Sequence, residues 1–63
     1  MGNIVSHQHR YFVEYRDLLG TVTGWRMHSS YRIAWRAKQV ARAREVPGIR
    51  QFRVVDTWGE ILR

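Results

Sequence analysis

The residues able to carry out catalysis or bind a metal are few in this chain. His7 and His9 stand two positions apart and would share one face of a strand, and with His28 they have the donor set of a three-histidine zinc site. No acidic residue accompanies them to orient the rings, and such histidines are more often surface residues, so we expect no metal. Ser29 and Ser30 have no histidine and carboxylate placed to activate them, which favours helix capping over nucleophilic catalysis.

The acidic residues and the chain length also argue against an enzyme. The five Asp and Glu residues show no paired spacing for acid and base catalysis, and Gly20 and Gly24 are too isolated to form a phosphate-binding loop. A chain of 63 residues buries only about 60% of the surface that it exposes when unfolded, which leaves little room for a deep cleft. We therefore expect a non-enzymatic binding module without a cofactor.

Charge is the strongest signal in the composition. The chain holds eleven Lys and Arg residues, ten of them Arg, against five Asp and Glu residues, for a formal net charge of +6. Guanidinium groups form planar pairs with phosphate or carboxylate and stack on aromatic rings, whereas a surface built only for solubility would use Lys freely. Residues 31–46 hold five of the cations and one acid, a net charge of +4, so the positive field belongs to this segment.

This segment predicts a helix whose outward face mixes cations with aromatic rings. At about 3.6 residues per turn its apolar residues form one buried stripe. The opposite face is the candidate binding site and contains Tyr31, Arg32, Trp35, Lys38, Gln39 and Arg42. Cations that neutralise phosphates and rings that stack on bases fit a nucleic acid, either DNA or RNA. The same residue types fit a protein partner, a second copy of the chain included, because Trp, Tyr and Arg are enriched in interface hot spots. In a third interpretation, Trp35 packs beneath arginine stems and contacts no partner.

The elements that must position this face can be read from the alternation and the turn residues. Ser29 or Ser30 is expected to cap the helix, and Pro47 with Gly48 is expected to end it. The sequence DTWG predicts a hairpin turn with Gly59 in the left-handed region. The expected elements are strands at residues 9–17, 21–28, 49–56 and 60–63 and a helix at residues 31–46.

These elements predict an α+β fold of the order ββαβ(β). It is a two-layer sandwich with an antiparallel sheet of three to four strands, in the order 2-1-3-4, and one helix packed on one face. The sequence does not decide which face of the sheet the helix covers; the other face has no cover and is called the open face. If Phe12, Phe52 and Val54 form the core, Tyr11 and Tyr15 are an exposed aromatic pair on the open face, as in sheet-based RNA readers. In the alternative, the tyrosines themselves are core.

The chain shows no internal repeat and no linker. We expect a flexible N-terminal tail at residues 1–8 and one small domain at residues 9–63. No run of residues is long and apolar enough for a membrane span, and the N-terminal residues lack the pattern of a signal peptide. We therefore expect a soluble, cytoplasmic protein that binds no membrane.

The order of hairpin, helix and strand within about sixty residues resembles the layout of the small transcription-inhibitor proteins of T7-like phages, which bind host RNA polymerase. The likeness lies in the layout and is carried by no shared motif. It implies, as the alternative to nucleic-acid binding, a compact phage or mobile-element protein that binds and modulates a host protein such as RNA polymerase or a defence complex.

Overall fold

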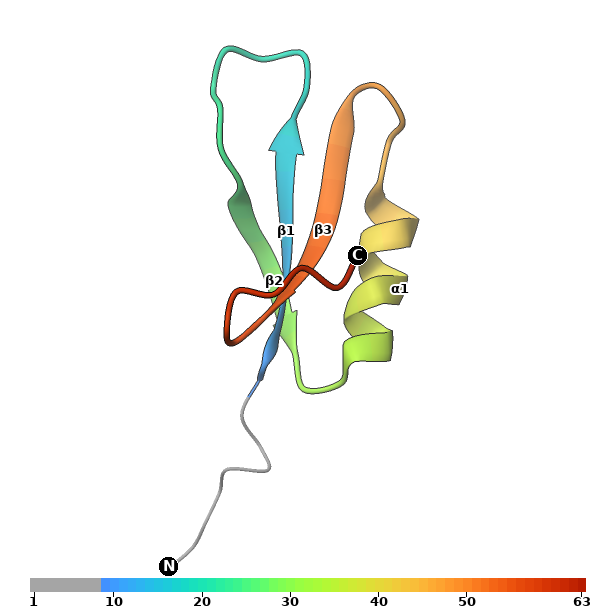
Figure 1. Cartoon of the computed structure of the whole chain (residues 1–63). Helices are drawn as coiled ribbons and strands as arrows, with labels where there is room; N and C mark the ends of the chain where they lie inside the picture. Colours follow the sequence, from blue (N-terminus) through green and yellow to red (C-terminus); the bar gives the residue numbers. More distant parts are fainter. Residues whose placement is uncertain (1–8) are drawn as a thin grey trace, which may run out of the picture.

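A three-stranded antiparallel sheet with one helix on one face makes up the fold (Figure 1). The computed structural model describes residues 9–63, so the predicted tail at residues 1–8 lies outside the described residues. The strand order is β2-β1-β3, which confirms the α+β class, the antiparallel sheet and the central position of the first strand. The elements are β1 (Tyr11–Asp17), β2 (Arg26–Tyr31), α1 (Ala34–Arg44) and β3 (Arg50–Asp56).

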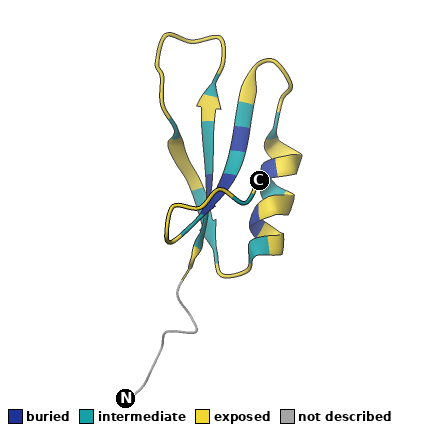
Figure 2. Cartoon of the chain, in the orientation of Figure 1, coloured by how far each residue is buried: buried dark blue, intermediate teal, exposed yellow. Residues whose placement is uncertain are grey.

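The core lies between α1 and the two strands β1 and β3. Val13 and Val54 stand directly opposite each other on these strands, and neither has any exposed surface. Ala37 and Ala41 meet them from the helix and are also fully buried, and Phe52 completes the cluster. Figure 2 shows the buried positions on β1, on β3 and on the side of α1 that faces them. Because the helix presents only methyl groups here, it packs close to the sheet.

The tyrosine-bearing face of β1 is the one that meets the helix. Tyr11 and Tyr15 pack against the core on either side of Val13. Tyr15 stands opposite Phe52 on β3, so the two side chains share a face. The prediction that Phe12 shares the core with Phe52 is therefore wrong, as is the exposed tyrosine pair on the open face. The alternative, with the tyrosines in the core, is confirmed.

The second strand and the start of the helix differ from the prediction. Ser29, Ser30 and Tyr31 belong to β2, where Tyr31 pairs with Tyr11 and packs against the core. The helix begins only at Ala34, after an extended N-cap residue that makes no side-chain capping bond. The predicted serine cap is wrong because strand pairing and burial of the Tyr31 ring hold this segment in the sheet.

The turns follow the prediction more closely than the last strand does. After the helix, Pro47 and Gly48 (φ 80°) occupy the positions that a type II turn requires. After β3, the carboxylate of Asp56 accepts hydrogen bonds from the backbone N–H groups of Trp58 and Glu60, both at 2.9 Å, and Gly59 has a positive φ. Beyond this turn the described residues form a single bridge, Val55 with Ile61, and no fourth strand. One or two ladder bonds are too few to define a strand.

Candidate functional site

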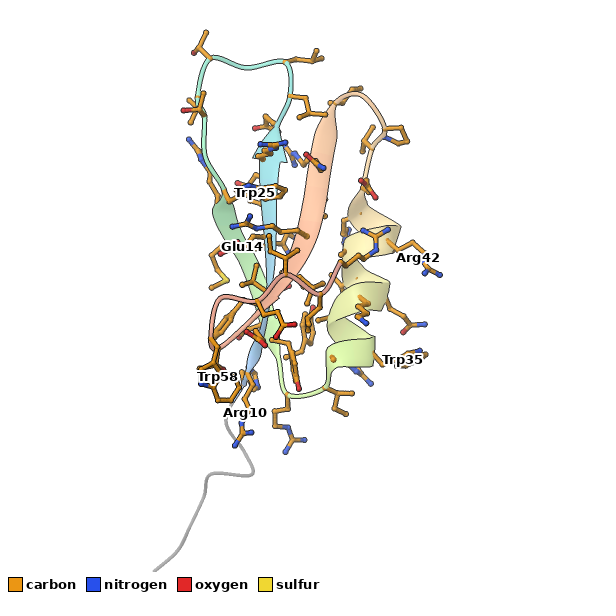
Figure 3. The ribbon with its side chains drawn as sticks, viewed as in Figure 1. Arg10, Glu14, Trp25, Trp35, Arg42 and Trp58 are labelled. Carbon is orange, nitrogen blue, oxygen red and sulfur yellow. The ribbon has the colours of Figure 1, made fainter. Side chains whose placement is uncertain are left out.

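The helix displays four of the six predicted binding residues on its outer side. Trp35 is 64% exposed, and Lys38, Gln39 and Arg42 are also exposed, opposite the buried stripe. Figure 3 shows Trp35 and Arg42 projecting away from the sheet. The ring of Trp35 thus lies outside the core, on the same helix face as the cations. We call Trp35, Lys38, Gln39 and Arg42 the outer helix face.

The two predicted residues that precede the helix are placed differently. Tyr31 lies in β2 and is half-buried against the core, so its ring is not part of the outer helix face. Arg32 lies in the short connection between β2 and α1 and is exposed. The helical period of about 3.6 residues begins only at Ala34, so it does not determine the direction of the Tyr31 side chain, which the pairing of β2 with β1 sets instead.

The charge of the helix is not compensated by its own residues. The segment Ala34–Arg44 contains four cations and no acid, and its first turn lacks the acidic residue that would complement the helix dipole. The ion pairs of the described residues all use arginines outside the helix. They join Arg50 to Asp17 at 2.7 Å, Arg53 to Glu14 at 2.8 Å and Arg63 to Glu45 at 3.3 Å.

The spacing of the helix cations is unfavourable for an isolated helix. Lys38 and Arg42 stand four residues apart, where like charges destabilise a helix by a few tenths of a kcal/mol. Arg42 and Arg44 lie in the last turn, where a cation interacts favourably with the helix dipole. Arg36 and Lys38 have no such local reason.

The open face of the sheet carries an arrangement that the sequence did not predict. The ring of Trp25 is covered by two guanidinium groups, that of Arg53 at 4.2 Å and that of Arg16 at 4.8 Å from its centroid. Arg53 also donates to Glu14 at 2.8 Å, and Arg16 donates to Gln51 at 2.9 Å. Trp25 and Glu14 lie over the sheet in Figure 3. The two guanidinium groups cover the Trp25 ring, and each also donates to a side chain of the sheet, so the network is structural rather than a free stacking surface.

The histidines and serines form a different set of contacts. His9 bonds to the hydroxyl of Ser30 at 3.0 Å, and His28 bonds to that of Ser29 at 2.9 Å. Within residues 9–63, no three His, Cys, Asp or Glu side chains gather in a way that could hold a metal ion. His7, the third member of the zinc hypothesis, lies outside the described residues.

Two further observations complete the description of the site. In the part of the chain that the structure describes, no helix has the length and apolar character needed to cross a bilayer. Comparison of the chain with protein families, with curated proteins and with solved structures finds no match. The functional argument therefore rests on the geometry and charge of the outer helix face.

Proposed function

We propose that the protein is a small, basic, non-enzymatic module that binds nucleic acid through the outer helix face. The observation that supports this most strongly is the helix charge: four cations, two of them (Lys38 and Arg42) on the outer helix face, no acid, and no ion pair within residues 9–63 that uses any of the four. A phosphate backbone supplies the missing negative charge along a line, and each neutralised phosphate releases a bound counterion.

The exposed ring of Trp35 adds a contact that cations alone do not provide. The ring is 64% exposed, and burying this apolar surface against a partner is favourable. A nucleic-acid base offers an aromatic face on which the ring can stack, and a sugar offers an apolar surface against which it can pack. Arg42 lies two turns further along the same face of α1, so ring and cation line up along the helix axis. This order suits a strand of alternating bases and phosphates that runs beside the helix.

The alternative partner is a protein with an acidic surface, which includes a host protein of the kind that the layout resemblance implies. An exposed Trp beside Arg residues is also typical of protein interface hot spots. The two partners differ in their dependence on salt, since a nucleic acid releases condensed counterions and a protein of ordinary charge density does not. A homodimer through this face would bring Lys38 and Arg42 of each helix toward those of the other, which is unfavourable.

The test uses Trp35→Ala and Arg42→Ala, with Arg26→Ala as the matched control. Arg26 is an exposed cation of β2, a strand on the far side of β1 from β3, so its loss changes net charge equally without altering the helix. Anisotropy of a fluorescein-labelled oligonucleotide should show weaker binding for both helix variants, by about 1–3 kcal/mol for Trp35→Ala. Arg26→Ala should bind almost as the unaltered chain does.

Thermal unfolding of the same variants separates binding from stability. Trp35→Ala should keep nearly the melting temperature of the unaltered chain, because its ring lies outside the core. A large fall in melting temperature with intact binding per folded molecule would make Trp35 a packing residue and contradict the proposal. Equal losses of affinity in Arg26→Ala and Arg42→Ala would mean that net charge, and not the helix face, governs binding.

A further inference from the structure

A second exposed tryptophan lies at the end of the molecule where the helix begins. Trp58, in the turn after β3, is 80% exposed, the largest exposed fraction among the large apolar side chains of the described residues. Figure 3 shows it beside Arg10, which precedes β1, while Trp35 stands in the first turn of α1 at the same end of the molecule. A ring so exposed contributes little to the packing of the core.

The turn holds the backbone of Trp58 in place although its ring is free. Its N–H donates to the Asp56 carboxylate at 2.9 Å, and the N–H of Gly59 donates to the Asp56 carbonyl at 3.0 Å. The hydroxyl of Thr57 donates to the carbonyl of Arg10 at 3.2 Å, which ties the turn to the start of β1. A ring on a fixed backbone loses little entropy when it stacks, so the turn is a preorganised platform.

Two hollows lie near this end of the molecule, and Trp58 lines one of them, whereas Trp35 lines neither. His9 lines both, so it lies between them. The first is lined by His9, Arg10, Phe12, Thr57 and Trp58, and the second by His9, Tyr31, Arg32, Ile33 and Arg36. Among the described residues that line them there are three arginines and no acid. The carboxylate of Asp56, two positions before Trp58, accepts from backbone N–H groups instead of pairing with Arg10.

We infer that these two hollows bind a single-stranded nucleic acid that passes from Trp35, across His9, to Trp58. This inference rests on the proposed function and names its substrate class. The rings of Trp35 and Trp58 provide stacking surfaces for bases; Arg10 lines the first hollow with Trp58, and Arg36, which follows Trp35 in α1, lines the second, so both can neutralise phosphates. Bases in a duplex are already stacked on their neighbours, so two such rings at one end favour an unpaired strand.

The test compares a single strand with a duplex for the full chain and for Trp58→Ala. The probes are a fluorescein-labelled thymidine DNA of about twelve nucleotides, within the usual range of site sizes for single-stranded binding, and the same strand annealed to its complement. Trp58→Ala should weaken binding of the single strand by roughly 5- to 150-fold, the equivalent of about 1–3 kcal/mol for a lost stacked base. Affinity for the duplex should stay within about two-fold.

The control for this substitution is Leu19→Ala. Leu19 is 76% exposed in the loop between β1 and β2, at the other end of the sheet, so its removal also deletes an exposed apolar side chain. It should leave both affinities unchanged. Arg10→Ala should weaken single-strand binding more than Arg26→Ala, since both remove one exposed cation but only Arg10 lines a hollow.

The outcomes separate the two proposals. If the unaltered chain binds the single strand and Arg42→Ala weakens it, but Trp58→Ala binds like the unaltered chain, the path across His9 is refuted and the outer helix face stands. A loss that is equal for single strand and duplex in Trp58→Ala also refutes the path. If the unaltered chain binds neither probe, both proposals fail, and a protein partner becomes the explanation of the two exposed rings.

Discussion

Placing a charge under the helix should unfold this protein, and Ala37→Glu is the substitution that does so most directly. Ala37 has no exposed surface and packs in the cluster of Val13, Val54, Phe52 and Ala41. The residues of this cluster are all apolar, so a carboxylate at position 37 would find no cation or hydrogen-bond donor among their side chains.

The expected cost is comparable with the whole stability of a chain of this size. Taking a carboxylate out of water costs several kcal/mol even after relaxation, and the extra side-chain atoms add about 1–3 kcal/mol of overpacking. A protein of 63 residues is stable by about 3–9 kcal/mol, at roughly 0.05–0.15 kcal/mol per residue. The variant should therefore be largely unfolded at 25 °C.

The matched control is Ala43→Glu, which makes the same substitution on the exposed side of the same helix. Both variants replace Ala with Glu and so change helix propensity equally. In Ala43→Glu the new carboxylate is exposed to water and lies between Arg42 and Arg44. Circular dichroism should show a cooperative melting curve for Ala43→Glu and none for Ala37→Glu. If Ala37→Glu melts like the unaltered chain, the face of α1 that meets the sheet is misassigned, and the outer helix face with it.

Three further outcomes can be checked by thermal unfolding. Arg53→Ala should destabilise the fold by about 1.5–3 kcal/mol, because it breaks a three-quarters buried ion pair with Glu14 and uncovers the ring of Trp25. Arg50→Ala breaks a more exposed ion pair with Asp17 and should cost at most about 1 kcal/mol. Equal losses of stability in the two variants would contradict a structural role for the open-face network. Gly48→Ala should cost about 1 kcal/mol from its φ of 80° alone, since no atom of the described residues lies within 4 Å of the added Cβ, and an unchanged melting temperature would mean that this turn is not held in the left-handed region. A chelator should leave the melting temperature unchanged, and a chelator-dependent fall would revive the zinc hypothesis.

The first and third strands, the helix body and both turns could be predicted from the sequence because their signals are local. The alternation around Val13 is regular, and the turn residues Pro47, Gly48 and Gly59 act on their own backbone. The polar residues of β2 gave no such signal. The alternation of its side chains between the two faces of the sheet is also interrupted, because the pairing register shifts opposite Val13 and Glu14. The sequence therefore predicts Tyr31 in the helix, whereas the structure has it in β2.

The candidate site was predicted where helix periodicity determines it and was missed where it depends on tertiary contacts. Trp35, Lys38, Gln39 and Arg42 lie on the outer side because the alanine stripe fixes the inner side. The position of Trp58 beside Arg10 depends on which strands pair, since 48 residues separate the two. The stacking of Arg16 and Arg53 on Trp25 depends on strand register in the same way, although the opposite charges of Glu14 and Arg53 are a signal for that register.

The central claim is that the helix cations contact phosphates, and the most direct measurement of it is the salt dependence of oligonucleotide binding. For a single strand, each neutralised phosphate contributes roughly −0.7 to the slope of log K against log salt concentration, so the two cations of the outer helix face, Lys38 and Arg42, predict a contribution of about −1.4 to the slope. Arg42→Ala should make the slope shallower by about one phosphate, whereas Trp35→Ala should weaken binding without changing it. A slope near zero for the unaltered chain, or a slope that Arg42→Ala leaves unchanged, would contradict binding of nucleic acid by the outer helix face.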